Sequence, residues 1–212
     1  MTDSRPGADL RSQFGDIDVY LFDQLLRGRF DARRRVLDAG CGDGRNLIWL
    51  LGHGFDCYGV DGDAHAVRRM REVAAQVAPH VPSDHFTVAD VDRLPHADAS
   101  MDAVICSAVL HFADNEHHFD LMLDEMWRVL APNGLFFARL ASNIGIEMSV
   151  GPAGRIVRLP DGSDRFIVDE AMLVSRTARL GGRLADPIKT TNVQQKRCMT
   201  TWCLIKSADS IK

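Results

Sequence analysis

Three glycines spaced two apart follow a short apolar stretch, and acidic residues lie on both sides of the turn. The segment from Val36 to Asn46 reads Val-Leu-Asp-Ala-Gly-Cys-Gly-Asp-Gly-Arg-Asn. Glycine reaches positive φ angles freely and, without a Cβ, lets a ligand approach the backbone closely. A helix beginning at Arg45 would direct its free N–H groups and the positive end of its dipole toward that ligand. The segment therefore predicts a loop that binds a nucleotide-type ligand.

The charges beside this loop indicate which nucleotide-type ligand it suits. A dinucleotide loop has the pattern G-x-G-x-x-G and places a pyrophosphate at a helix N-terminus. Here Arg45 stands where the third glycine of that pattern would be, and Asp38 and Asp43 would repel a phosphate. A ligand with positive groups and no phosphate is favoured. S-adenosylmethionine meets this requirement, because it carries an ammonium and a sulfonium group.

The same loop resembles motif I, D/E-x-G-x-G-x-G, of the class I S-adenosylmethionine-dependent methyltransferases. Residues 127–134 are similar to the R-V-L-K-P-G-G turn of that family, with Ala131 and Asn133 as departures. Asparagine tolerates left-handed backbone geometry, so we expect the turn to survive. The resemblance spans about residues 36–140. It implies an α/β fold with a doubly wound, seven-stranded sheet, mostly parallel but ending in an antiparallel pair of strands, which is the Rossmann-like methyltransferase fold.

Candidate cofactor contacts follow successive predicted strands, because ligands of parallel α/β sheets bind at the carboxyl ends of the strands. Asp61 ends the second strand, where a carboxylate can accept both ribose hydroxyls. The family resemblance implies that Asp90 takes the adenine amine and that the backbone N–H of Val91 reaches the ring. Ser107 begins a segment expected near the methionine portion. The predicted cofactor-binding residues are Asp38, Gly40, Cys41, Gly42, Asp61, Gly62, Asp90, Val91 and Ser107.

The candidate catalytic residue is His111, which follows the fourth predicted strand. Methyl transfer from a sulfonium is an in-line displacement on an activated donor, so positioning and desolvation can supply much of the catalysis. A general base is optional and depends on the pKa of the acceptor. Asp114, Glu116 and His117 are close to His111 in the sequence. The pair His117-His118 is expected on a helix surface, because no third ligand is spaced to complete a metal site. We expect no metal.

The acceptor is predicted to be a small molecule methylated on oxygen, nitrogen or sulfur. Residues 107–110 differ from the Asn/Asp-Pro-Pro-Tyr motif of methyltransferases that act on adenine or glutamine amides. A leading helix over 16–28 and a hairpin insertion at about 151–168 are expected to cover the acceptor pocket. Two alternatives stay open: an NAD(P)-dependent oxidoreductase, and a non-catalytic cofactor-binding protein on the same fold.

The elements that must position these residues alternate between strand and helix, which predicts a parallel, doubly wound sheet. The Asp-Gly pair at 161–162 predicts the tight turn of the hairpin, and Asp169 is expected to cap a helix that ends at Leu180. Two last strands without a helix between them should pair antiparallel. The predicted strands are 36–39, 57–60, 85–88, 101–107, 135–140, 182–188 and 198–205, and the helices before the hairpin are the leading helix capped by Asp16, 45–52, 64–78 and about 115–129.

Composition limits the class of protein. The chain has 212 residues, of which 46% are hydrophobic, and a net charge of −4. This length suffices to bury a core, so we expect one domain over residues 1–212. The acidic balance gives no general attraction to nucleic acid, and no apolar run of about 18 residues predicts a membrane span. A polar N-terminus and five cysteines without a C-x-x-C pair predict a cytoplasmic protein with reduced thiols. We expect a monomer or a homodimer.

Overall fold

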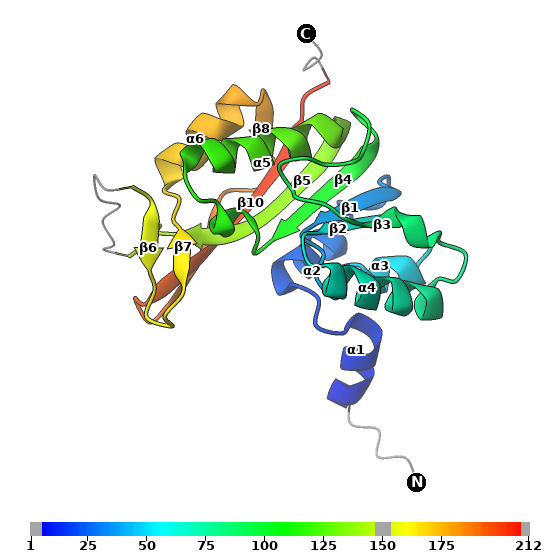
Figure 1. Ribbon diagram of the computed structural model, residues 1–212. Helices are drawn as coiled ribbons and strands as arrows, with labels where there is room; N and C mark the ends of the chain where they lie inside the picture. Colours follow the sequence, from blue (N-terminus) through cyan, green and yellow to red (C-terminus); the bar gives the residue numbers. More distant parts are fainter. Residues whose placement is uncertain (1–5, 147–153, 209–212) are drawn as a thin grey trace.

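A central sheet with helices on both faces organises the molecule (Figure 1). The computed structural model describes residues 6–146 and 154–208. The strands are β1 (Arg35–Ala39), β2 (Asp56–Asp61), β3 (Phe86–Val88), β4 (Met101–Ser107), β5 (Leu130–Ser142), β6 (Ile156–Arg158), β7 (Asp164–Phe166), β8 (Gly182–Leu184), β9 (Lys189–Val193) and β10 (Arg197–Lys206). The helices are α1 (Pro6–Phe14), α2 (Val19–Leu26), α3 (Ile48–Gly52), α4 (Ala64–Val77), α5 (Glu116–Val129) and α6 (Glu170–Arg179), with short 3₁₀ turns η1 (Ser83–His85) and η2 (Leu110–Phe112).

The main sheet has the order β3-β2-β1-β4-β5-β10, with β8 and β9 beyond β10. The first five of these strands run parallel, whereas β10 is antiparallel to β5 over residues 198–205. Because β5 occupies one edge of β10, β8 and β9 must share the other edge, at residues 204–206 and 197–201 of β10. The eight strands therefore occupy seven positions, and the predicted fold class is confirmed.

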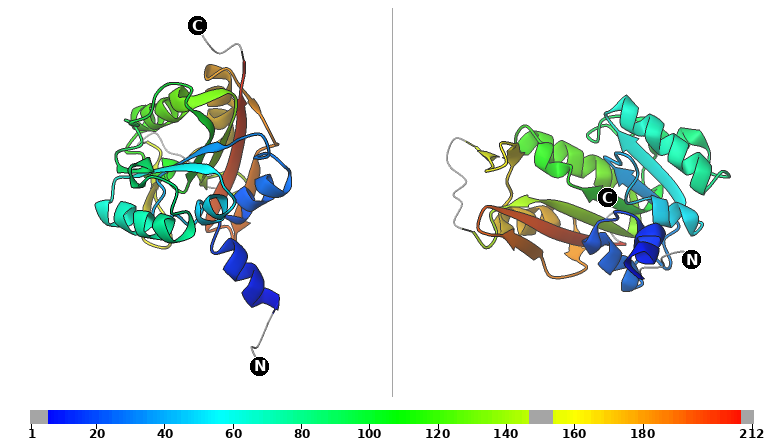
Figure 2. Two further views of the ribbon diagram at one scale, coloured as in Figure 1. Left: turned by 90° about the vertical axis from the view of Figure 1, so that its right-hand side faces the viewer. Right: turned by 90° about the horizontal axis from the view of Figure 1, so that it is seen from below.

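Two hydrophobic cores, one on each face of the sheet, explain why the middle strands are apolar throughout. Leu37 and Val104 belong to the core beneath α5 and α6, whereas Val36 and Ile105 belong to the core beneath α2, α3 and α4. Side chains alternate between the faces of a strand, so a strand covered on both faces reads as continuously hydrophobic. Figure 2 shows the two helical layers on either side of the sheet. This arrangement fixes the carboxyl ends of β1 and β4 beside each other.

The leading helix predicted over 16–28 is wrong in its boundaries, because α2 covers only residues 19–26 of that range and a separate helix, α1, precedes it. Gly15 adopts a φ of 60° and ends α1. Asp18, and not Asp16, caps α2, because its side chain accepts a hydrogen bond from the N–H of Tyr20. In Figures 1 and 2, α1 projects away from the rest of the molecule, whereas α2 lies against it.

Three other boundaries differ from the predictions. The turn at residues 132–134 lies inside β5, where the pairing with β4 shifts register and Asn133 takes the expected left-handed φ of 62°. The strand predicted at 182–188 is β8 followed by a bend, and β9 was not predicted. The hairpin consists of β6 and β7 turning at Gly162, and residues 147–153 of the predicted insertion lie outside the described residues.

Candidate functional site

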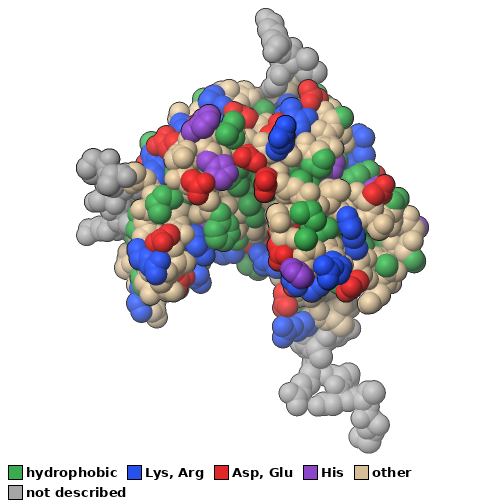
Figure 3. All heavy atoms as spheres, in the orientation of Figure 1, with side chains coloured by type: hydrophobic (Ala, Val, Ile, Leu, Met, Phe, Trp, Pro, Cys, Tyr) green, Lys and Arg blue, Asp and Glu red, His purple; other side chains and the backbone are tan. Residues whose placement is uncertain are grey.

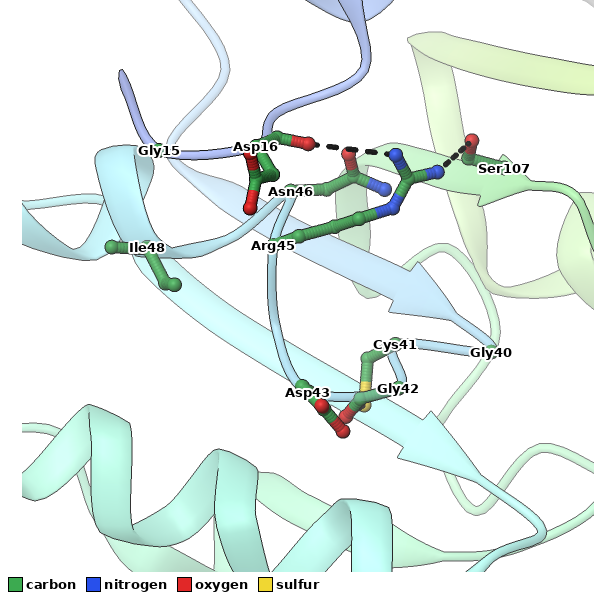
Figure 4. Close-up of a pocket in the computed structure, with 10 residues that line it drawn as sticks. All are labelled: Gly15, Asp16, Gly40, Cys41, Gly42, Asp43, Arg45, Asn46, Ile48 and Ser107. Carbon is green, nitrogen blue, oxygen red and sulfur yellow. Dashed lines mark hydrogen bonds between the residues drawn. The ribbon is translucent and has the colours of Figure 1, made fainter. Parts of the chain in front are cut away.

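A pocket of about 590 Å³ opens at the carboxyl end of β1, at the glycine loop. Figure 4 shows Arg45 reaching from the loop across to Ser107, at the end of β4. Ten residues line the pocket: Gly15, Asp16, Gly40, Cys41, Gly42, Asp43, Arg45, Asn46, Ile48 and Ser107. Four of them, Gly40, Cys41, Gly42 and Ser107, were predicted as cofactor contacts.

The three glycines of the loop have different roles although all take positive φ angles: 82° at Gly40, 51° at Gly42 and 85° at Gly44. A Cβ at Gly40 would collide with the side chain of Val109, and one at Gly44 with the side chain of Met70. Nothing lies within 4 Å of the position that a Cβ would take at Gly42. Packing thus requires the outer two glycines, whereas the middle one leaves the backbone open to a ligand.

The helix predicted to begin at Arg45 begins at Ile48 instead. The N–H groups of Leu47 and Ile48 both bond to the carbonyl of Gly44, at 2.8 and 3.0 Å, so the chain completes a tight turn before the helix starts. The side chains of Arg45 and Asn46, rather than the free end of a helix, therefore face the pocket (Figure 4).

Asp38 is buried behind the loop, and neither of its carboxylate oxygens has a hydrogen-bond partner among the described residues. Burial raises the pKa of Asp38 to about 7, against the opposing effects of the Arg45 guanidinium and of the Asn46 amide, which lies near the carboxylate without meeting hydrogen-bond geometry. The carboxylates of Asp61 and Asp18 raise this pKa further. A buried charge without a partner is unfavourable, so a positive group bound nearby would stabilise the ionised form of Asp38.

Asp61, at the end of β2, is joined to the loop. One of its oxygens accepts a hydrogen bond from the N–H of Gly42 at 2.9 Å, and the other accepts from a backbone N–H two residues onward. Asp90 lies close by, since its Oδ1 would be 3.4 Å from a Cβ built on Gly62. The structure therefore brings Asp61, Gly62 and Asp90 together beside the glycine loop.

The remaining predicted contacts differ in what they present to the pocket. Ser107 lines the pocket but is only 7% exposed, and its hydroxyl is engaged by Asp18 and Arg45. The side chain of Val91 is buried in the core beneath α5, so it has no role in the pocket. Cys41 is buried, and burial raises the pKa of its thiol far above the usual range, so the group stays protonated.

A network of charged and polar side chains that was not predicted closes the pocket on the side of α2. Asp18 is completely buried and accepts hydrogen bonds from Ser107 Oγ at 2.9 Å and from Arg139 Nη1 at 3.2 Å. Arg45 Nη2 lies 3.9 Å from the same carboxylate and 3.1 Å from Ser107 Oγ. The amide oxygen of Asn46 accepts from the N–H of Asp18. These partners are far apart in the sequence, and only the Arg-Asn pair directly after the loop could have been noticed.

His111 lies at a second pocket, of about 190 Å³, between η2 and the β6–β7 hairpin. It is 6% exposed, and its Nδ1 has no hydrogen-bond partner among the described residues. Burial, together with the charge of Arg165, lowers the pKa of His111 to about 4, so the imidazole is neutral at pH 7. The other lining residues are Phe112, Ala113, Asp114, Ile156, Asp164 and Phe166.

The other polar residues after β4 are engaged on the outside of α5. Glu116 pairs with Arg155, and His118 lies 3.2 Å from a carboxylate oxygen of Asp114. Within residues 6–146 and 154–208, no three His, Cys, Asp or Glu side chains gather in a way that could hold a metal ion. None of the described helices is long and apolar enough to cross a membrane.

Comparisons with known proteins agree with this geometry. Residues 37–138 match the family model of the methyltransferase domain. A malonyl-[acyl-carrier protein] O-methyltransferase of Enterobacter lignolyticus is 30% identical over 150 residues, covering 69% of this chain and 55% of that protein. A demethylmenaquinone methyltransferase of Deinococcus radiodurans is 34% identical over 150 residues, covering 60% of this chain and 59% of that protein. The chain thus spans little more than half the length of these curated relatives.

A solved structure shows the same fold. The 1,6-didemethyltoxoflavin-N1-methyltransferase of Burkholderia thailandensis, with S-adenosylhomocysteine bound, aligns with a TM-score of 0.70 at 18% identity, covering 95% of this chain and 83% of that one. The family match and the two relatives define the class as that of the methyltransferases, and the solved structure shows the same fold. Residues 37–138 of this chain match the methyltransferase domain family, and the resemblance drawn from the glycine loop is confirmed.

Proposed function

We propose that this protein transfers the methyl group of S-adenosylmethionine to a small-molecule acceptor. The observation that carries the proposal is the pair of charges at the glycine loop: the carboxylate of Asp38, buried without a partner behind the loop, and the half-exposed guanidinium of Arg45, which lines the pocket. They stand beside the open backbone of Gly42. When bound, this cofactor supplies an electrophilic methyl group on a positively charged sulfur.

The pocket suits the amino-acid end of the cofactor. An ammonium group would offset the unfavourable burial of Asp38, and a carboxylate would be attracted by Arg45. The phosphates of NAD(P) would also be attracted by Arg45, but they would bring no ammonium group to Asp38, and they would meet the carboxylate of Asp43, which lines the pocket and pairs with Arg69. These charges favour the methyltransferase over the oxidoreductase alternative.

The acids after β2 and β3 suit the nucleoside end. Asp61 already bonds to the N–H of Gly42, and each carboxylate oxygen has a second lone pair that can accept from a ribose hydroxyl. Asp90 is exposed beside Gly62 and is free to accept from the adenine amine, while the backbone N–H of Val91 serves the ring as the family resemblance implies. A ligand bound across both ends would place its sulfur between these groups, toward Ser107.

The chemistry on the acceptor side depends on positioning more than on a strong base. A neutral imidazole with a low pKa accepts a hydrogen bond but takes a proton only weakly, so His111 would orient an acceptor. The relatives are named for acceptors as different as a malonyl carrier protein and demethylmenaquinone. The donor site is therefore the feature that this chain can share with all of them.

Isothermal titration with S-adenosylhomocysteine tests the proposed donor site. We expect the wild type to bind, and Asp61→Ala to bind about 10- to 100-fold more weakly, since a hydrogen bond to a charged group contributes about 1.5–3 kcal/mol. The matched control is Glu72→Ala, which removes an exposed carboxylate from α4 and should leave the affinity unchanged.

Two further measurements complete this test. Mass spectrometry of the small molecules that co-purify with the protein should find S-adenosylmethionine or S-adenosylhomocysteine, and a screen of acceptors should find methylation. Retention of NAD(P), or no binding of S-adenosylhomocysteine by the wild type, contradicts the proposal. Tight cofactor binding without turnover on any acceptor favours the non-catalytic alternative.

A further inference from the structure

Arg165, in β7, is a cation without an acidic partner. Arg155 and Arg158, at the other strand of the hairpin, pair with carboxylates at 2.8 and 3.0 Å, whereas no carboxylate lies within ion-pair distance of Arg165 in the described part of the chain. Its Nη1 donates to the carbonyl of Asp164, while Nε and Nη2 have no partner among the described residues and are not buried. A guanidinium with free donors is suited to bind a planar anion.

An aromatic ring holds this guanidinium in place. The Cζ of Arg165 lies 4.6 Å from the ring centroid of Phe112, in η2, and Phe112 is itself 55% exposed. A guanidinium stacked on a ring has already lost side-chain freedom but keeps its N–H edge available, so less entropy is lost when an anion binds to it. The ring adds apolar surface directly beside the charge. The two side chains together suit a ligand that joins an anionic group to an apolar body.

Arg165 is placed at the carboxyl end of the sheet, on the side of the donor pocket. Val157, directly opposite Arg165 in the hairpin, packs with Ala141 of β5 in a small third core. Ala141 and Arg139 face the same side of β5, because alternate residues of a strand do, and Arg139 is in register with Ser107 of the donor pocket. Figure 3 shows a notch between the part of the molecule that carries the hairpin and the part that carries α4, with hydrophobic and basic side chains beside it. A molecule bound at Arg165 can therefore extend along β5 toward the donor pocket.

The two acids of the hairpin already have partners. Asp164 pairs with Arg158, and one carboxylate oxygen of Asp161 accepts hydrogen bonds from both the N–H and the hydroxyl of Ser163. Neither carboxylate therefore neutralises Arg165, and an anion that binds to it displaces no ion pair of the described chain.

The wall toward the donor pocket is also short of free acids. Arg45 and Arg139 share the one buried carboxylate of Asp18, at 3.9 and 3.2 Å. The two acids that line the pocket, Asp16 and Asp43, are each paired with an arginine of a neighbouring helix. Cations on two sides of the notch attract an anion and disfavour a cation.

We propose that Arg165 binds a carboxylate group of the methyl acceptor, with the apolar body of the acceptor against Phe112. This inference rests on the proposed function, because only the donor site makes such a ligand an acceptor. A carboxylate presents two oxygens in one plane and matches the paired N–H groups of a guanidinium. One free cation suits a single negative charge, and the acids at 161 and 164 would repel a dianion such as a phosphate more strongly. The carboxylate serves recognition and is distinct from the atom that accepts the methyl group.

Nuclear magnetic resonance titration with benzoate and benzamide tests this inference, with S-adenosylhomocysteine saturating the donor site. The two probes have nearly the same shape and differ in charge. We expect benzoate to bind more tightly and to shift the Nε–H signal of Arg165. In Arg165→Gln the ratio of benzoate affinity to benzamide affinity should fall about 3- to 10-fold, between the contributions of an exposed ion pair and of a hydrogen bond to a charged group. The matched control is Arg68→Gln, which removes an exposed cation from α4 and should leave the ratio unchanged.

Two further variants and a third probe locate the anion and define its chemistry. Phe112→Ala removes a half-exposed ring and should weaken both probes, whereas Arg45→Gln should leave their ratio unchanged. Equal wild-type affinities for the two probes, or an unchanged ratio in Arg165→Gln, would overturn the inference. So would a ratio that falls in Arg45→Gln instead, or tighter binding of phenyl phosphate than of benzoate. Failure of the wild type to bind S-adenosylhomocysteine would count against the proposed function only, since the probes can be compared without it.

Discussion

Replacing Asp38 by asparagine should stabilise the unliganded protein at neutral pH while weakening its cofactor binding. The pKa of Asp38 is raised from 3.8 to about 7 by burial, so the folded protein holds this proton at pH values where the unfolded chain has lost it. The free energy of unfolding therefore falls as the pH rises from about 4 to about 7 and is lowest above that window. Each pKa unit corresponds to 1.36 kcal/mol, so about 4 kcal/mol is lost across the whole window.

Urea unfolding of wild type and Asp38→Asn at pH 5, 6, 7 and 8 measures this effect. Between pH 5 and pH 8, the stability of the variant relative to wild type should increase by about 3 kcal/mol, because two pH units of the window are crossed. Glu72→Gln makes the same carboxylate-to-amide change on an exposed side chain of α4 and should show a pH-independent difference of less than about 0.5 kcal/mol.

The affinity for S-adenosylhomocysteine should change in the opposite direction. Asp38→Asn removes the negative charge behind the loop, so we expect binding at pH 8 to weaken about 10-fold, which corresponds to one pKa unit of interaction between this charge and the ammonium group of the ligand. A stability difference that does not change with pH, or a variant that is both less stable at pH 8 and unaltered in binding, would refute the reasoning about this carboxylate.

Three more comparisons check the backbone and capping arguments, all by urea unfolding. Gly40→Ala should lower the free energy of unfolding by about 2–4 kcal/mol, because the substitution combines a left-handed φ with a collision in the core. Gly42→Ala should lower it by only about 1–2 kcal/mol, because nothing lies near the added Cβ. Equal losses in the two variants would contradict this argument. Ala108→Gly should raise the free energy of unfolding by about 1 kcal/mol, because Ala108 has a left-handed φ of 65°. A lower free energy of unfolding would show that packing of the Ala108 methyl group outweighs this backbone effect. Asp169→Ala should lower the free energy of unfolding by at least about 1 kcal/mol, because it removes both the cap on the Met172 N–H and the ion pair with Arg155. Asp169→Asn keeps an oxygen that can cap the helix and should lose less.

The sequence was most informative where chemistry depends on neighbouring residues. The spacing of the glycines, the acid at the end of each successive strand, and the left-handed Asn133 depend on local backbone geometry, and the structure has them where they were expected. The strand pattern also revealed the fold class, because strands buried on both faces are continuously apolar.

The sequence was least informative where contacts join distant segments. Asp18 reads as an ordinary polar residue, yet it is the buried centre of a network that reaches Arg139 in β5. The break between α1 and α2 depends on Asp18 capping the second helix, a role that Asp16 could equally have filled on sequence grounds. Likewise, α3 starts later than predicted because the chain first forms a turn at Gly44, and helix propensities do not predict that turn.

The buried carboxylate of Asp18 also makes the first turn of α2 and the glycine loop thermodynamically linked. It caps α2 through the N–H of Tyr20, and the same group holds Ser107 and lies beside Arg45. Coupling free energies are reciprocal, so a ligand that draws the guanidinium away from Asp18 alters the stability of α2, and fraying of α2 alters ligand affinity by the same amount. Hydrogen exchange of the first amides of α2, a helix that does not line the donor site, should therefore report whether that site is occupied.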